Sequence, residues 1–311
     1  MAKKNNKLFL TIPKKIIIYT LVIIFLSSFI TYRFFLIKNP INDNPQENKQ
    51  ALNESNPQKD SYTERDSPYD NRSYNNSAQA GQVIFHGPRD KKKIALTFDA
   101  EMTDYMKANL QSGKVKSSYD KRIVDILNKT NTKATFFLTG MWIELYPNVT
   151  QELSQNPLFE LGSHSYSDTS FQGYCFGLKQ IPDTLDIEEI GATEKLLREY
   201  AGIDNQLFRF PGGCYSPHDV QVVNDANDIV VHWDVKGSDG FNDNAKLIEK
   251  NVVDNVQNGS IIILHLNGAP TAPKTADALP EIISSLKAKG YEFVKVNELL
   301  GLPTEQKSPN Y

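Results

Sequence analysis

The chain has 311 residues, of which 40% are hydrophobic and 23% are charged, and its formal net charge at pH 7 is −3. This length accommodates one large domain with an extension, or two modest domains. Because the charge is nearly balanced, the composition gives no indication of a nucleic-acid partner.

The N-terminal region combines a basic tail with a long apolar segment. Residues 1–15 contain five lysines and no acidic residue, and residues 16–37 carry a single charge, Arg33. The apolar segment reaches the roughly 20 residues that a helix needs to cross a bilayer if Arg33 extends to the interface. The lysines predict a single-pass transmembrane helix with a cytoplasmic N-terminus and an extracytoplasmic remainder. The alternative is a signal peptide cleaved near Ser27 and Ser28.

Residues 38–82 are rich in Asn, Gln, Ser, Asp and Pro and contain no Phe, Trp, Val or Met. Such a segment cannot bury enough apolar surface to offset the entropy lost on ordering. We therefore expect a disordered linker here, a folded domain at 83–303 and a short tail at 304–311.

The region 83–303 alternates short apolar runs with longer amphipathic stretches. The expected strands are 94–98, 134–138, 159–161, 207–210, 229–233, 260–264 and 291–294. The expected helices are 120–128, 142–156, 187–200, 218–227, 245–256 and 276–289. This alternation is typical of a parallel sheet with crossover helices, and about seven such units predict an α/β fold that is a distorted (β/α) barrel.

Polar residues recur at the carboxyl ends of the expected strands. They are Asp99, His164, Arg209, Asp234 and His265. A parallel barrel gathers the loops that follow its strands on one face, and active sites lie on that face. The pattern therefore predicts a single site that contains these side chains.

Cys175 and Cys214 form an even pair, and each follows one of these polar segments. An extracytoplasmic location permits a disulfide between them. Two unpaired buried thiols are the alternative.

Five short motifs occur in a fixed order along the chain. They are TFDAE at 97–101, HSYSD at 164–168, RFPGG at 209–213, WD at 233–234 with Asp239, and ILH at 263–265. Together they resemble the polysaccharide deacetylase family, the NodB-homology domain of family four carbohydrate esterases, over nearly all of 83–302. The resemblance implies metal-dependent hydrolysis of N-acetyl groups from an N-acetylglucosamine-containing polysaccharide such as peptidoglycan.

The resemblance also implies roles for five residues. Asp99 matches the general base that activates water, and Arg209 matches the arginine that orients this base. The backbone amide of Gly212 stands where the family stabilises the oxyanion. His265 matches the general acid, and Asp239 matches the aspartate that orients its imidazole.

The family's metal ligands are one aspartate and two histidines spaced i, i+4, a spacing that brings side chains together on a helical turn. His164 matches the first histidine, Asp168 replaces the second, and Ala100 replaces the aspartate. The pair implies a divalent ion, Zn²⁺ first, with Co²⁺, Mn²⁺ or Fe²⁺ as alternatives. Glu101 or Asp99 could complete the site. Neighbouring side chains on a strand point to opposite faces, so Glu101 would have to turn inward after the strand ends.

The fourth motif departs from the family at two positions. Lys236 stands where an aspartate is usual, and Gly240 stands where a tryptophan lines the pocket, a wall that Phe241 could supply. Two other functions stay open: a non-catalytic glycan-binding domain with a degenerate metal site, and an O-acetyl esterase on the same fold.

Overall fold

The computed structural model describes residues 82–204 and 206–303, which fall in the expected folded domain. The expected basic tail, transmembrane helix, nearly all of the linker and the C-terminal tail lie outside the described residues. Among the residues described, no helix is both long and apolar enough to span a bilayer.

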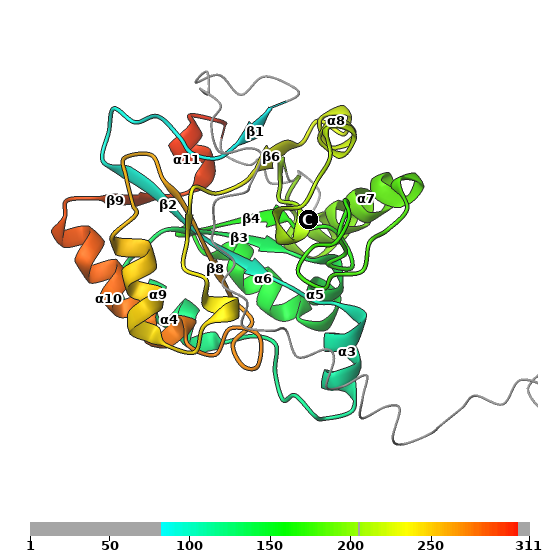
Figure 1. The fold of residues 1–311 in the computed structure, drawn as a ribbon, viewed down its shortest axis with the longest axis horizontal. Helices are drawn as coiled ribbons and strands as arrows, with labels where there is room; N and C mark the ends of the chain where they lie inside the picture. The colour runs from blue at the N-terminus through cyan, green and yellow to red at the C-terminus, as the bar shows by residue number, and fades with distance from the viewer. Residues whose placement is uncertain (1–81, 205, 304–311) are drawn as a thin grey trace, which may run out of the picture. The chain divides into compact units, whose positions relative to one another are not determined.

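A parallel β-sheet forms the centre of the domain (Figure 1). Its strands are β1 (Val83–Ile84), β2 (Lys93–Ala100), β3 (Ala134–Leu138), β4 (Phe159–Ser163), β5 (Leu207–Phe208), β6 (Ile229–Val231), β7 (Val235–Lys236), β8 (Ile261–His265) and β9 (Glu292–Val294). The order across the sheet is β1-β6-β5-β4-β3-β2-β8-β7, and β9 pairs with β2 beside it. Every one of these pairs is parallel.

The sheet curls on itself because one segment belongs to two strand pairs. β6 pairs with β5, and β7, which follows β6 after three residues, pairs with β8. Backbone bonds continue along the segment, since Asp234 donates to the carbonyl of Ile261 at 3.2 Å. The segment 229–236 therefore joins the two sides of the sheet, and the expected distorted (β/α) barrel is confirmed.

Helices surround this sheet (Figure 1). They are α3 (Asp104–Gln111), α4 (Lys121–Lys129), α5 (Gly140–Leu145), α6 (Pro147–Gln155), α7 (Asp186–Leu196), α8 (Pro217–Asp225), α9 (Ala245–Val253), α10 (Thr275–Ala288) and α11 (Val296–Leu300). α10 packs against both α9 and α4 on one side of the domain, and α5 packs against α7 on the other.

The alternation of side chains along β2 separates core from site. Leu96, Phe98 and Ala100 are fully buried in the largest hydrophobic cluster, which the surrounding helices share. Thr97 and Asp99 therefore face the opposite side, the barrel interior. The residues that follow β2 in the same extended conformation therefore also alternate between the core and the barrel interior.

Several expected elements differ in detail from the structure. The expected helix 142–156 is two helices, because Pro147 begins α6 and cannot donate a backbone hydrogen bond to continue α5. The two-residue strands β1 and β7 and the helices α3 and α11 were not predicted. β1 and β7 are too short to show a periodic pattern, and α3 buries no residue.

Candidate active site

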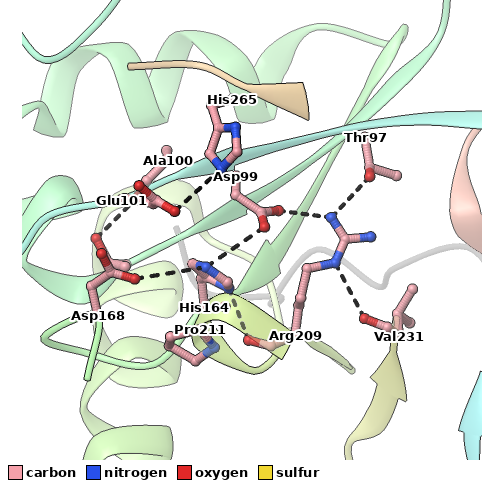
Figure 2. A network of polar contacts seen from close by, with 12 residues as sticks. Thr97, Asp99, Ala100, Glu101, His164, Asp168, Arg209, Pro211, Val231 and His265 are labelled. Carbon is pink, nitrogen blue, oxygen red and sulfur yellow. Dashed lines mark hydrogen bonds and ion pairs between the residues drawn. The ribbon is translucent and has the colours of Figure 1, made fainter. Parts of the chain in front are cut away.

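The strands β2 and β8 bring the two predicted acid/base residues side by side. Asp99 and His265 are direct register partners at the carboxyl ends of these strands. Figure 2 shows both side chains directed toward one group of polar residues. Asp99 is 2% exposed and the His265 side chain is 14% exposed, so Asp99 is enclosed whereas His265 keeps limited access to solvent.

Arg209 is fully buried and holds Asp99 in place. Its Nη1 donates to Asp99 Oδ1 at 2.7 Å and to Thr97 Oγ1 at 2.8 Å. Its Nε and Nη2 donate to backbone carbonyls of Val231 and His232, both at 3.2 Å. A buried charge pair with this many hydrogen bonds has a fixed geometry. The expected orientation of the base by Arg209 is consistent with these contacts.

Asp239 holds His265 through both its ring and its backbone. Asp239 Oδ1 lies 2.9 Å from His265 Nδ1, and Oδ2 accepts from the His265 backbone N–H at 2.8 Å and from Thr275 Oγ1. Burial alone would lower the pKa of His265, but the carboxylates of Asp239 and Glu101 outweigh it and raise that pKa well above its ordinary value. The ring is therefore protonated at neutral pH and can act as a proton donor.

Gly212 lies in a tight turn beneath a disulfide. Its φ of 62° is in the left-handed region, where glycine is favoured. A Cβ there would lie 2.4 Å from Cys175 Sγ, so the loop around Cys175 covers the glycine closely. Cys175 and Cys214 form a disulfide, which settles the alternatives left open by the sequence.

Three side chains outside the acid/base pair converge on one point (Figure 2). Glu101, His164 and Asp168 can each bring one ligand atom within 4.8 Å of the others. His164 Nε2 lies 3.8 Å from Asp168 Oδ1 and 3.7 Å from Asp99 Oδ2. The expected His164–Asp168 pair is therefore brought together, and Glu101 joins it.

The expected helical turn between His164 and Asp168 is absent, so that part of the prediction was wrong. The segment is a turn in which Ser165 and Asp168 have positive φ values of 60° and 55°. Glu189 on α7 holds it, since its Oε2 accepts from the backbone N–H groups of Tyr166 and Ser167 at 3.0 and 2.9 Å. Non-glycine residues in this conformation often mark functional strain.

The chemistry of this group fits a divalent metal ion. His164 Nδ1 lies 2.9 Å from the carbonyl of Arg209, which can only accept, so Nδ1 carries the proton and Nε2 keeps its lone pair. Nε2 and both carboxylate oxygens of Asp168 are buried without a hydrogen-bond partner. Unpaired buried acceptors are costly, and a cation among them would satisfy all three.

Electrostatics of the same residues agree with this assignment. Burial lowers the pKa of His164, which keeps its imidazole neutral as ligation requires. Burial, with the nearby carboxylates of Glu101 and Asp99, raises the pKa of Asp168 well above its ordinary value. A positive ion in the group would offset this repulsion.

Three other positions named in the sequence analysis, 100, 234 and 236, do not contribute a side chain to the group of Glu101, His164 and Asp168. Ala100 has no ligand atom in its side chain, and its methyl group is fully buried in the hydrophobic core. The prediction that Asp234 belongs to the site was wrong: it binds Ile261 at the start of β8, at the other end of the strand from His265, and receives hydrogen bonds from Arg89 at 2.7 Å and from the Ile261 backbone at 2.9 Å. Lys236 is exposed at the edge of β7.

Sequence reasoning missed three supporting residues. Thr275 binds Asp239, and Glu189 binds the turn at 164–168; both come from distant helices, and no local pattern indicates such contacts. Asn267, two residues after His265, binds Glu101, and its position just beyond a strand end was a usable signal.

Known proteins resemble this chain in sequence and in fold. The sequence model described as "Polysaccharide deacetylase" matches residues 86–229. A peptidoglycan-N-acetylglucosamine deacetylase of Bacillus cereus is 30% identical over 223 residues, which cover 72% of this chain and 74% of the relative.

Solved structures agree with this relationship. The crystal structure of a peptidoglycan N-acetylglucosamine deacetylase superposes with a TM-score of 0.62 at 28% identity, covering 72% of this chain and 95% of that one. A CE4 family pseudoenzyme from Bacillus anthracis, 22% identical with a TM-score of 0.58 over 71% of this chain and 70% of its own, shares the fold. The chain therefore belongs to the polysaccharide deacetylase family of hydrolases.

Proposed function

We propose that this chain is a metal-dependent N-deacetylase that acts on an N-acetylglucosamine-containing polysaccharide such as peptidoglycan. One observation carries the proposal. Asp99 and His265 are register partners on adjacent strands, and each is held by its own buried partner, Arg209 or Asp239. A base and a protonated acid on the same rim can serve the two proton transfers that amide hydrolysis needs.

His164 and Asp168 would hold the metal, with Glu101 beside them. The support is their unpaired buried acceptor atoms. A divalent ion bound there would polarise the acetyl carbonyl and lower the pKa of a bound water. Zn²⁺, Co²⁺, Mn²⁺ and Fe²⁺ are all compatible with such nitrogen and oxygen ligands.

The chain's own residues account for the proton transfers. Asp99 takes a proton from the attacking water, whose oxygen bonds to the acetyl carbon. The backbone amide of Gly212 stabilises the oxyanion that forms. His265 gives its proton to the amide nitrogen as the C–N bond breaks. Acetate and a free amino sugar are the products.

An exposed aromatic pair beside the site supports a glycan substrate. Phe176 and Phe241 are 66% and 74% exposed, and their ring centroids are 5.4 Å apart. A Cβ on Gly212 would lie 3.2 Å from the Phe176 ring, and a Cβ on Gly240 would lie 3.4 Å from the His265 ring. Phe176 therefore adjoins the turn of Gly212, and Phe241 directly follows a residue that adjoins His265, so the pair would be placed to cover the apolar face of a sugar ring.

The same residues bear on the two alternatives, a non-catalytic glycan-binding domain and an O-acetyl esterase. A glycan-binding domain without catalysis would have no use for a buried Arg209–Asp99 pair or for the Asp239–His265 pair. An O-acetyl esterase would need the same groups as an N-deacetylase. The basic tail and apolar segment at 1–37 support an enzyme that is anchored in the membrane and faces the cell envelope.

Acetate release tests the proposal. The full chain, purified in detergent, would be incubated with an N-acetylglucosamine oligomer, with peptidoglycan and with an O-acetylated glycan, with and without added metal. Metal-dependent acetate release from the N-acetylated substrates is expected, and Asp99→Asn and His265→Ala should each abolish it. Release from the O-acetylated glycan alone would indicate the esterase. No release from any substrate would contradict an enzymatic function.

A further inference from the structure

The ladder between β2 and β8 continues past the ends of both strands through one side chain. Asp99 pairs with His265, so two residues further on Glu101 lies opposite Asn267. Asn267 Oδ1 accepts from the Glu101 backbone N–H at 3.0 Å, and its Nδ2 donates to the Glu101 carbonyl at 2.7 Å. One side-chain amide thus binds both backbone polar groups of Glu101, as a neighbouring strand would.

This contact decides where the Glu101 side chain points. Extended backbone places residues 99 and 101 on the same face and residue 100 on the other. Asp99 faces the barrel interior while Ala100 packs in the core, and Glu101 accordingly returns to the interior. Its Oε1 lies 3.3 Å from His265 Nε2, and the carboxylate comes within 4.8 Å of the ligand atoms of His164 and Asp168.

Asn267 is itself held rigidly. The residue is 1% exposed, and its Nδ2 also donates to Ser118 Oγ at 2.8 Å. The primary amide of Asn267 carries a separate carbonyl acceptor and NH₂ donor, which is why it can bind the N–H and the C=O of one residue at the same time; glutamine carries the same group on a longer side chain. The residue touches neither Asp99 nor His265 by a side-chain hydrogen bond among the contacts of the described chain, so its connection to the site runs through Glu101.

We infer that Glu101 supplies the third metal ligand that Ala100 cannot, and that Asn267 is its positioning residue. The resulting set is one imidazole nitrogen and two carboxylates. Carboxylates favour harder ions such as Mn²⁺, whereas imidazole ligands favour Zn²⁺. The site therefore discriminates less strongly for Zn²⁺ over Mn²⁺ than a site with two histidines. The metal's role rests on the proposed function, but the ligand set rests on the geometry of these residues.

Metal binding to the full chain, stripped with a chelator, tests the ligand set without any activity measurement. Mn²⁺ binding would be followed by the loss of the free-ion electron paramagnetic resonance signal, and Zn²⁺ binding by calorimetry. Glu101→Gln should weaken Mn²⁺ binding at least about tenfold, because an amide oxygen replaces a charged ligand. Glu152→Gln, at an exposed position on α6, is the matched control and should bind as the unmodified chain does.

A double-mutant cycle tests the role of Asn267. Asn267→Ala should weaken Mn²⁺ binding in the unmodified chain but cause no further loss in the Glu101→Gln background, because its effect passes through Glu101. A purely structural role would lower the affinity in both backgrounds. Asn255→Ala, at an exposed site, is the control. Denaturation of each metal-free variant would verify that it is folded.

The ion preference is tested by placing a histidine at position 168, which gives the site two imidazole ligands. Asp168→His should raise the ratio of Zn²⁺ to Mn²⁺ affinity at least about tenfold. Unchanged Mn²⁺ binding in Glu101→Gln, or an unchanged ratio in Asp168→His, would overturn the inference. Metal bound through Glu101 without acetate release would leave the inference intact and contradict the proposed function. Acetate release that Glu101→Gln leaves unchanged would contradict the inference and leave the proposed function intact.

Discussion

Asp239 contacts His265 at two atoms, the ring Nδ1 and the backbone N–H, and thereby fixes both the position and the charge of the ring. Asp239 is buried and has its own pKa lowered: burial alone would raise it, but His265 and the hydrogen bonds it receives outweigh burial. The pair thus exists as carboxylate and imidazolium at neutral pH.

Replacing Asp239 tests the source of this charge. The pKa of His265 is raised by carboxylates, so the ring stays protonated to higher pH, and activity that needs the proton is lost as pH rises through that pKa. Asp239→Asn should lower the pKa and move the alkaline limb of the pH–rate profile to lower pH. It should also reduce kcat by about 10²-fold or more. An alkaline limb that does not move would show that Asp239 does not raise the pKa of His265.

Arg209 should contribute strongly to stability as well as to orientation. Arg209→Met would leave the carboxylate of Asp99 buried without its partner, which typically costs about 3–5 kcal/mol. Urea denaturation would measure this change. Because the cost comes from the unpaired charge, Asp99→Asn in the same chain should recover part of it. If the stability losses of the two single substitutions add up in the double variant, the unpaired carboxylate of Asp99 is not the cause of the loss in Arg209→Met.

The Cys175–Cys214 disulfide closes a loop with a sequence separation of 39 residues. Replacing both cysteines with alanine should lower the free energy of unfolding by about 2–4 kcal/mol, through the larger freedom of the unfolded chain. Denaturation of the double variant with and without reductant checks this value. Reductant should destabilise the unmodified chain by a similar amount and leave the double variant unaffected.

The exposed aromatic pair should influence substrate affinity more than chemistry. Phe176→Ala and Phe241→Ala should each raise KM for an N-acetylglucosamine oligomer about 2- to 10-fold, in line with the energy of an aromatic contact. Neither substitution should change stability appreciably, because both rings are mostly exposed. Tyr105→Ala, an exposed aromatic on α3, is the control. Equal KM values for all three variants would exclude a sugar contact at the pair.

The acid/base half of the site could be predicted from the sequence because its residues follow strands. Asp99, Arg209 and His265 come at the ends of β2, β5 and β8 or just beyond them, and a parallel sheet gathers such positions on one face. Asp239 followed from its motif. The fold class could be predicted from the alternation of apolar runs with amphipathic stretches. This alternation is present in the sequence even where the strands, such as β5 and β6, are shorter than expected.

The third ligand could not be predicted in the same way. The sequence left Glu101 and Asp99 open as the third ligand, and the alternation of side chains counted against Glu101 because it was applied from the position of Ala100. Applied to Asp99, the same alternation places Glu101 on the interior face, provided that the chain stays extended beyond β2. That condition depends on Asn267, which is 166 residues away in sequence. The place of Asn267 after a strand end indicates that it lies near the site, but no local pattern identifies Glu101 as its partner. The contact between Phe176 and Phe241 leaves no local pattern either.

The segment 229–236, which joins the two sides of the barrel, also supplies two of the carbonyls that bind Arg209, those of Val231 and His232. The seam of the barrel and the alignment of the base are consequently one structural unit. A fluctuation that opens the seam removes the two backbone hydrogen bonds to the guanidinium, which is then held only by Thr97 and by Asp99 itself, and the orientation of Asp99 is less restricted. Catalytic competence would then be lost by local opening well before the domain unfolds, and protection of the backbone amides along 229–236 from hydrogen exchange would report how often the site is assembled.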